Sequence, residues 1–167
     1  RGREQADSHA GAEAQRQASA QLAALFEHTP VAISVVDTEQ KIVLVNKVTA
    51  DLYGQDPAVF VGMDIADLAG FWPEFGKVVQ AGLEVIASGK AQYTSAVWNP
   101  PEGADPVIYD IVCFPIRDSQ DAVIQVGLFM LDVTAQKLAE SALAEREAML
   151  SSLFEHVKVR IAVITAD

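Results

Sequence analysis

The chain changes from helix to strand within one stretch, 22-LAALFEHTPVAISVV-36. Residues 8–27 contain no proline and many alanines and glutamines, a composition that favours helix. Pro30 pushes the residue before it away from helical geometry, so the helix should end there. Residues 31–36 are rich in β-branched side chains, which is typical of a strand. The stretch therefore predicts a long helix that leads directly into a sheet.

A similar stretch, 150-LSSLFEHVKVRIAVI-164, occurs near the other end of the chain. A repeat at this distance indicates one whole folded unit between the two copies and the start of a second unit. We therefore expect a helical flank over residues 1–21, a folded domain over 22–134, a linker helix over 135–156 and the beginning of a second domain over 157–167.

Composition limits the classes of partner. The 167 residues are 50% hydrophobic, which is enough for one sizeable core. Twelve Lys and Arg stand against 23 Asp and Glu, and a net charge of -11 repels phosphate backbones and anionic lipid headgroups. We therefore expect neither nucleic acid nor direct membrane contact. No apolar run is long enough for a membrane span, and no signal peptide is visible. The single cysteine, Cys113, suits a reducing compartment, so cytoplasmic localisation is expected.

Turn residues divide the rest of the chain into short elements. Two β-branched runs form a predicted hairpin, and Asn46 is a candidate cap for the helix that Gly54 ends. Later runs rich in Val, Ile and aromatic residues predict three more strands. The expected strands are 31–36, 42–45, 92–98, 107–114 and 123–131, and the expected helices between them are 47–53, 57–61, 64–68 and 73–88. This order predicts an α+β fold with an antiparallel sheet.

The last expected strand is apolar on both faces. Val123, Gly127, Phe129 and Leu131 alternate with Ile124, Val126, Leu128 and Met130. A strand of this kind needs cover on both sides. We expect the helix over residues 8–27, from its own chain or from a partner chain, to provide the second cover.

A helix without Gly or Pro is expected from Thr134 to about His156. Apolar side chains recur in it at steps of four and three, although an arginine interrupts the seam. The seam consists of Ala139, Leu143, Arg146, Leu150 and Leu153. Two interpretations remain open: a helix packed on its own domain, or a parallel two-stranded coil that links one domain to the next. The candidates for dimerisation are Leu22, Leu25, Phe26, Leu143 and Leu150.

Five short motifs between Leu22 and Thr134 follow one another at ordinary spacing. They are 25-LFEHTPVAI-33, Val45-Asn46 with Ala50 and Tyr53-Gly54, Val61-Gly62, 114-FPIRD-118 and 132-DVT-134. Together they resemble the PAS domain, a sensor module of bacterial signalling proteins. The resemblance implies a five-stranded antiparallel sheet with inserted short helices, flanked by an N-terminal helix and a coiled-coil-like C-terminal helix. The second copy at 150–164 resembles the entry to another PAS domain.

Two turns depart from the family pattern. The family usually places glycine after its first and fourth strands, where a positive φ is needed. This chain has Gln40 at the first turn and Gln120 or Asp121 at the second. We therefore expect these hairpins to use other turn types or longer loops.

The sequence offers little support for a haem or a photoactive flavin. Haem-binding relatives supply a His from the helical segment, whereas His9, His28 and His156 all lie on the terminal helices. Relatives of the light-oxygen-voltage type need a reactive cysteine in the same segment, and this chain has none there. Cys113 lies on a strand and is interpreted as a small core residue, with redox sensing as the alternative. The cofactor therefore stays unknown.

The family resemblance places a ligand pocket between the sheet and the helical segment. By strand alternation, the side chains that line it are Trp98, Tyr109, Cys113, Leu128 and Met130. A core filled by side chains and a pocket for a small apolar or aromatic ligand both remain open, because few polar groups converge there.

The expected function is that of a sensory PAS domain that detects a small molecule or another cellular signal. It would act as a homodimer and signal through its C-terminal helix to an output domain of the same parent chain, either a histidine kinase or a cyclic-di-GMP enzyme. Asp132 and Thr134 are the expected transmission residues. The fragment itself should not be an enzyme, because no catalytic set, phosphate loop or metal-ligand spacing can be assembled. The alternative is a ligand-free dimerisation and transmission module.

Overall fold

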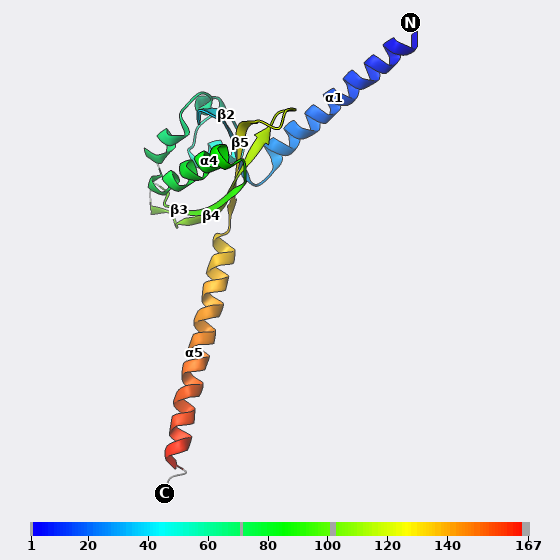
Figure 1. Ribbon diagram of the computed structural model, residues 1–167. Coiled ribbons are helices and arrows are strands. Elements are labelled where there is room, and N and C mark those ends of the chain that lie inside the picture. Colours follow the sequence, from blue (N-terminus) through cyan, green and yellow to red (C-terminus); the bar gives the residue numbers. More distant parts are fainter. Residues whose placement is uncertain (1, 71, 101–102, 165–167) are drawn as a thin grey trace. The chain divides into compact units, whose positions relative to one another are not determined.

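The computed structural model describes residues 2–70, 72–100 and 103–164, with the backbone alone for residues 2–10 and 154–164. The chain divides into two units, Arg1–Asp132 and Val133–Asp167. The first unit contains the sheet and every element except the last helix (Figure 1). Its elements are α1 (Gly2–His28), β1 (Ala32–Asp37), β2 (Ile42–Val45), α2 (Lys47–Leu52), α3 (Pro57–Phe60), the 3-10 turns η1 (Ile65–Gly70) and η2 (Pro73–Phe75), α4 (Gly76–Ser88), β3 (Gln92–Trp98), β4 (Val107–Arg117) and β5 (Val123–Asp132).

The five strands form one antiparallel sheet in the order β2-β1-β5-β4-β3. The predicted α+β fold is therefore confirmed, and four of the five strands begin at the residue predicted for them. The helix α4 packs against β3, β4 and β5 (Figure 1). We call the side of the sheet that faces the helical segment, residues 47–88, the inner face, and the opposite side the outer face.

Asn46 joins three elements of the first unit. It is completely buried, and its Nδ2 donates hydrogen bonds to the carbonyl oxygens of Phe26 at 3.1 Å and Val31 at 2.8 Å. Its Oδ1 accepts from the backbone amides of Ile33 and Thr49, each at 3.0 Å. The bond to Thr49 caps α2, as the sequence predicts. One amide side chain therefore ties the end of α1 and the start of β1 to the helical segment.

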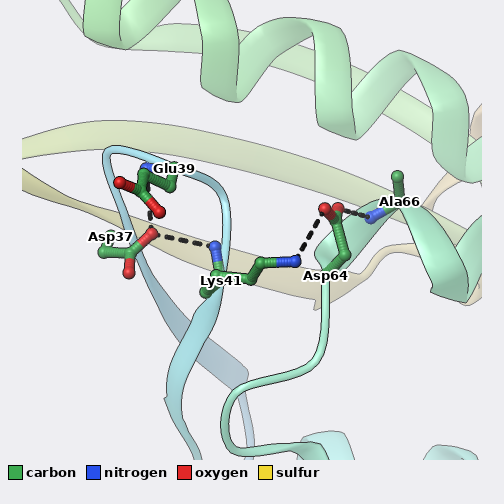
Figure 2. A network of polar contacts seen from close by, with 5 residues as sticks. All are labelled: Asp37, Glu39, Lys41, Asp64 and Ala66. Carbon is green, nitrogen blue, oxygen red and sulfur yellow. Dashed lines mark hydrogen bonds and ion pairs between the residues drawn. The ribbon is translucent and has the colours of Figure 1, made fainter.

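The expectation for the two glycine-poor turns is wrong. Gln40 and Asp121 keep the positive φ usual for glycine, at 66° and 65°. In the first turn, the Asp37 carboxylate accepts hydrogen bonds from the amides of Glu39 and Lys41, both at 2.9 Å (Figure 2). In the second turn, Asp118 accepts in the same way from the amides of residues 120 and 122. These carboxylates stabilise the tight turn and offset the cost of the left-handed residue.

Segments outside the sheet cover parts of both its edges. At β2, the amide of Ile42 donates to Met63 and its carbonyl accepts from Gly62. Lys41 also forms a salt bridge of 3.1 Å with Asp64 (Figure 2). At β3, the carbonyl of Val97 accepts from the Trp72 indole at 2.8 Å, and its amide donates to the Glu74 carboxylate at 3.1 Å. Each edge strand therefore has part of its outward backbone hydrogen-bonded.

The second unit consists of α5, Thr134–Ile164. The predicted helix is present, but it continues through residues 159–164, where the start of a second domain predicts a strand. An isolated strand leaves its backbone groups without partners, whereas a helix satisfies them within the segment. Leu143, Leu150 and Leu153 are exposed on α5. The coil and the second domain stay predictions, and residues 165–167 lie outside the described part.

Candidate functional site

The inner face of the sheet brings together the residues predicted to line a pocket. Tyr109, Cys113, Leu128 and Met130 are all buried there. Trp98 is half-buried and packs against the same core. Strand alternation therefore predicts their inward direction correctly. Helical-segment side chains pack against them, so these positions belong to a well-filled core whose use by a ligand stays a prediction.

An aromatic cluster centred on Trp72 extends this group. The Trp72 ring lies 5.2 Å from Phe75, 6.4 Å from Trp98 and 5.8 Å from Tyr109, centroid to centroid. Its indole nitrogen also donates to the carbonyl of Val97 on β3. Sequence reasoning missed Trp72, because strand alternation says nothing about the loop that precedes η2. A tryptophan next to a proline in the helical segment was the available signal.

Two tyrosine hydroxyls lie among these apolar side chains. Burial raises the pKa of Tyr53, which stands at the C-terminal end of α2, and the nearby Tyr109 raises it further. Burial also raises the pKa of Tyr109. Both phenols therefore stay protonated and can donate or accept a hydrogen bond at neutral pH. These hydroxyls are polar groups that could orient a ligand among the surrounding apolar side chains.

Cys113 lies in the same core on β4. Its side chain is fully buried, and burial raises the pKa of the thiol to about 11. Reactive cysteines have a lowered pKa and are partly exposed, so this environment is typical of a structural cysteine.

Tyr109 also links the core to the predicted exit of the sheet. It stands directly opposite Asp132 in the ladder between β4 and β5. Directly opposed residues of an antiparallel pair have their side chains on the same face. The Asp132 carboxylate contributes to the raised pKa of Tyr109. Thr134, the second predicted transmission residue, is the first residue of α5.

The outer face of the sheet contains a groove that sequence reasoning did not predict. Its volume is about 620 Å³, and it is open to solvent. It is lined by Val31, Tyr93, Thr94, Ser95, Asp110, Ile111, Val112, Phe129 and Leu131. The apolar outer face of β5 was the signal in the sequence for an apolar surface here. The shape of the groove could not be predicted, because it depends on the neighbouring strands. The predicted dimerisation residues Leu22 and Leu25 on α1 are 67% and 69% exposed, so these two side chains do not cover the groove.

Within the described part of the chain, no three His, Cys, Asp or Glu side chains lie close enough together to hold a metal ion. His28 is exposed at the end of α1. The side chains of His9 and His156 lie outside the described residues. Over the same described part, no helix combines the length and apolar character that crossing a bilayer requires.

Solved structures with the same fold come from several organisms. The VqmA dimer of Vibrio cholerae is 20% identical with a TM-score of 0.58, and the match covers 70% of this chain and 52% of VqmA. The PAS domain of a Colwellia psychrerythraea protein is 18% identical with a TM-score of 0.55, covering 69% of this chain and 96% of that one. The PAS domain of an HTR-like protein from Haloarcula marismortui is 18% identical with a TM-score of 0.57, covering 74% and 98%.

The matched region thus spans about half of VqmA but nearly all of the isolated PAS domains. At these identities the likeness shows the fold. A comparison with curated proteins found no match. The family profile described as PAS fold matches residues 26–138, which is more than half of the chain. The sheet, the helical segment and the sequence profile agree, and the chain belongs to the PAS fold family.

Proposed function

We propose that this PAS domain detects a small-molecule or cellular signal and transmits it to a downstream output domain through α5, acting as a homodimer. The observation that carries the proposal is the position of Tyr109. Its ring is 5.8 Å from Trp72 in the core, and it stands opposite Asp132 at the end of the sheet. A change of packing at the aromatic cluster that moves Tyr109 also changes the surroundings of Asp132. A signal then needs only to bind one of the two arrangements better than the other.

The ligand class that suits this core is a small apolar or aromatic molecule. Trp72 and Trp98 offer ring faces, and the hydroxyls of Tyr53 and Tyr109 offer hydrogen bonds. VqmA, which has the same fold, is described as bound to DPO, and this analogy supports a small-molecule ligand. VqmA is also described in complex with DNA. The net charge of -11 argues against DNA contact by this chain.

The output domain is a histidine kinase or a cyclic-di-GMP enzyme in the same cytoplasmic parent chain. This part of the proposal rests on the family resemblance. The 132-DVT-134 motif lies where β5 ends and α5 begins, which supports a transmitting role for Asp132 and Thr134.

The test is Asp132→Ala in the parent protein, with output activity measured with and without the stimulus. We expect the response to be lost while the near-UV circular dichroism of the domain is unchanged. Asp105→Ala is the matched control, because it removes the same charge from an exposed loop residue. A normal response in the Asp132 variant would refute the transmitting role.

A second candidate function is ligand-free dimerisation and transmission. The observation in its favour is the close filling of the inner face, where Cys113 and Leu128 are almost completely buried. Native mass spectrometry of the purified chain separates the two functions. A dimer with a reproducible small-molecule adduct supports the sensor, and a clean dimer without added mass supports the second function.

A further inference from the structure

The helical segment is fixed to the two edges of the sheet in different ways. At β2, three backbone hydrogen bonds of 2.7, 2.8 and 3.0 Å join residues 62–65 to Gln40 and Ile42. The salt bridge between Lys41 and Asp64 adds a further contact at this edge (Figure 2). Paired backbone hydrogen bonds fix the separation and register of two segments, so this edge is held firmly.

At β3, the helical segment is held by side chains instead. The Trp72 indole donates to the carbonyl of Val97 at 2.8 Å, and the Glu74 carboxylate accepts from the amide of Val97 at 3.1 Å. A change of side-chain rotamer is sufficient to break such bonds, whereas a backbone bond breaks only when the chain itself moves. The helical segment can therefore open at β3 while it stays attached at β2.

The aromatic cluster of the core lies at this side-chain contact. Trp72 is buried, whereas Trp98, whose ring centroid is 6.4 Å away, is half-buried, so the cluster reaches solvent here. Tyr109 lies on the inner face, 5.8 Å from the Trp72 ring. An opening at Trp72 therefore gives a path from solvent to Tyr109.

The negative charge of Glu74 strengthens the contact with β3. The hydrogen bond from the Val97 amide lowers the pKa of Glu74, and the Lys77 ammonium, 3.1 Å from the carboxylate, lowers it further. The side chain is therefore ionised at neutral pH, and a charge-assisted hydrogen bond is stronger than a neutral one. Because Lys77 lies in the first turn of α4, one carboxylate joins η2, α4 and β3.

We propose that Trp72 and Glu74 form a latch on β3, and that a small apolar or aromatic molecule enters the aromatic cluster when this latch opens. In the closed state, both side chains are bonded to Val97. In the open state, residues 72–75 move away from β3, and the contacts of residues 62–65 act as the hinge. The inference rests on the small-molecule ligand of the proposed function and names its route of entry.

Hydrogen exchange of the whole chain, followed by nuclear magnetic resonance, tests the latch in a Glu74→Ala variant. The change removes the acceptor of the Val97 amide but leaves the carbonyl that accepts from Trp72. Independent bonds predict faster exchange at Val97 alone, whereas a latch opens as one unit. We therefore expect the indole proton of Trp72 to exchange about tenfold faster too, since a hydrogen bond to a charged group is lost. Exchange of the Ile42 amide, which is bonded to Met63 at the hinge, should not change.

Two variants and a second measurement complete the test. Glu84→Ala is the matched control, because it removes the same charge from an exposed position of α4. Glu74→Gln keeps an uncharged acceptor for the Val97 amide and should give an intermediate rate at Trp72. Acrylamide quenching measures the access of a small neutral solute, because both tryptophans of the chain, Trp72 and Trp98, belong to the cluster. We expect the quenching constant to rise in Glu74→Ala and to stay unchanged in Glu84→Ala.

The possible failures can be told apart. Unchanged exchange at Trp72 in the Glu74→Ala variant would overturn the latch and leave the ligand of the proposed function standing. Equal acceleration at Ile42 and Trp72 would also overturn the latch, because the domain would then open as a whole. A native mass spectrum without an adduct would reject the ligand itself, and with it the route of entry.

Discussion

Replacing the buried Asn46 by aspartate tests whether its two donated hydrogen bonds hold the end of α1 to the sheet. The new side chain keeps the size of the old one and both acceptor functions, so the cap of α2 survives. At neutral pH it donates nothing, and the carbonyls of Phe26 and Val31 each lose a partner. A buried group left without its partner costs about 1–3 kcal/mol. We therefore expect the free energy of unfolding to fall by about 2–6 kcal/mol at pH 7.

The dependence on pH identifies the cause. The new carboxyl is desolvated and faces two carbonyl oxygens, so its pKa in the folded state rises above the unfolded value of about 3.9. Because the pKa of the new carboxyl is higher in the folded state, its protonation stabilises the folded state at pH values below the pKa of the unfolded state. This stabilisation is lost as the pH rises through the pKa of the folded state. The loss of free energy of unfolding in the Asn46→Asp variant, relative to the wild type, should therefore be smaller near pH 4, where the protonated carboxyl can donate one of the two hydrogen bonds, and should grow towards pH 7.

The assay is urea unfolding of both proteins, followed by circular dichroism at several pH values. Comparison at each pH cancels the titration of groups that the two proteins share. Thr49→Val is the matched control, since it removes a hydroxyl from the same cluster without adding a titratable group. We expect this control to lower the free energy of unfolding by about 1 kcal/mol at every pH. The reasoning would be refuted if Asn46→Asp lowered the free energy of unfolding by less than about 1 kcal/mol at pH 7, or if the loss did not change between pH 4 and pH 7.

Three further predictions concern a turn, the outer face of the sheet and the core. Asp121→Gly should raise the free energy of unfolding by up to about 1 kcal/mol in urea titrations, because it relieves a left-handed residue, whereas Asp121→Val should lower it. Gly127→Ala should cost about 1–3 kcal/mol in the same assay, because the added methyl group would clash with the Phe114 ring; Gly76→Ala, which meets nothing within 4 Å, should not. With a pKa of about 11, Cys113 should be about one part in a thousand thiolate at pH 8. Labelling by a thiol reagent should therefore follow unfolding, and rapid labelling of the folded protein would contradict its burial.

Local signals explain why so much of the sheet could be predicted. The strands follow β-branched runs, and Gly54 and Gly89 end their helices with φ of 62° and 64°. The turn at Gln40 could not be predicted in the same way. The left-handed backbone of Gln40 depends on the Asp37 carboxylate. The side-chain amide of Gln40 donates a hydrogen bond to the carbonyl of Val79 in α4 at 3.4 Å. That contact exists only once the fold has formed.

The candidate site, like the fold, could be predicted from the sequence only in part. Alternation along a strand was sufficient to place Tyr109 and Cys113 on the inner face. The position of Trp72 depends on contacts that the segment before η2 makes with β3 and β4, and the outer-face groove depends on three strands lying side by side. Sequence patterns therefore predicted the direction of individual side chains better than they predicted the shape of the surfaces that those side chains form.

The covered edges of the sheet have a consequence for aggregation. An open edge strand is a template on which further strands can add without limit, as in fibrils. In this domain, the backbone of Ile42 is already paired with residues 62 and 63, and the Trp72 and Glu74 side chains occupy the outward groups of Val97. An incoming strand would have to displace these contacts before it could pair along the full edge. At these two positions the contacts therefore hinder open-ended growth by strand addition, which favours association through the faces and helices of the domain, where contacts between copies can close.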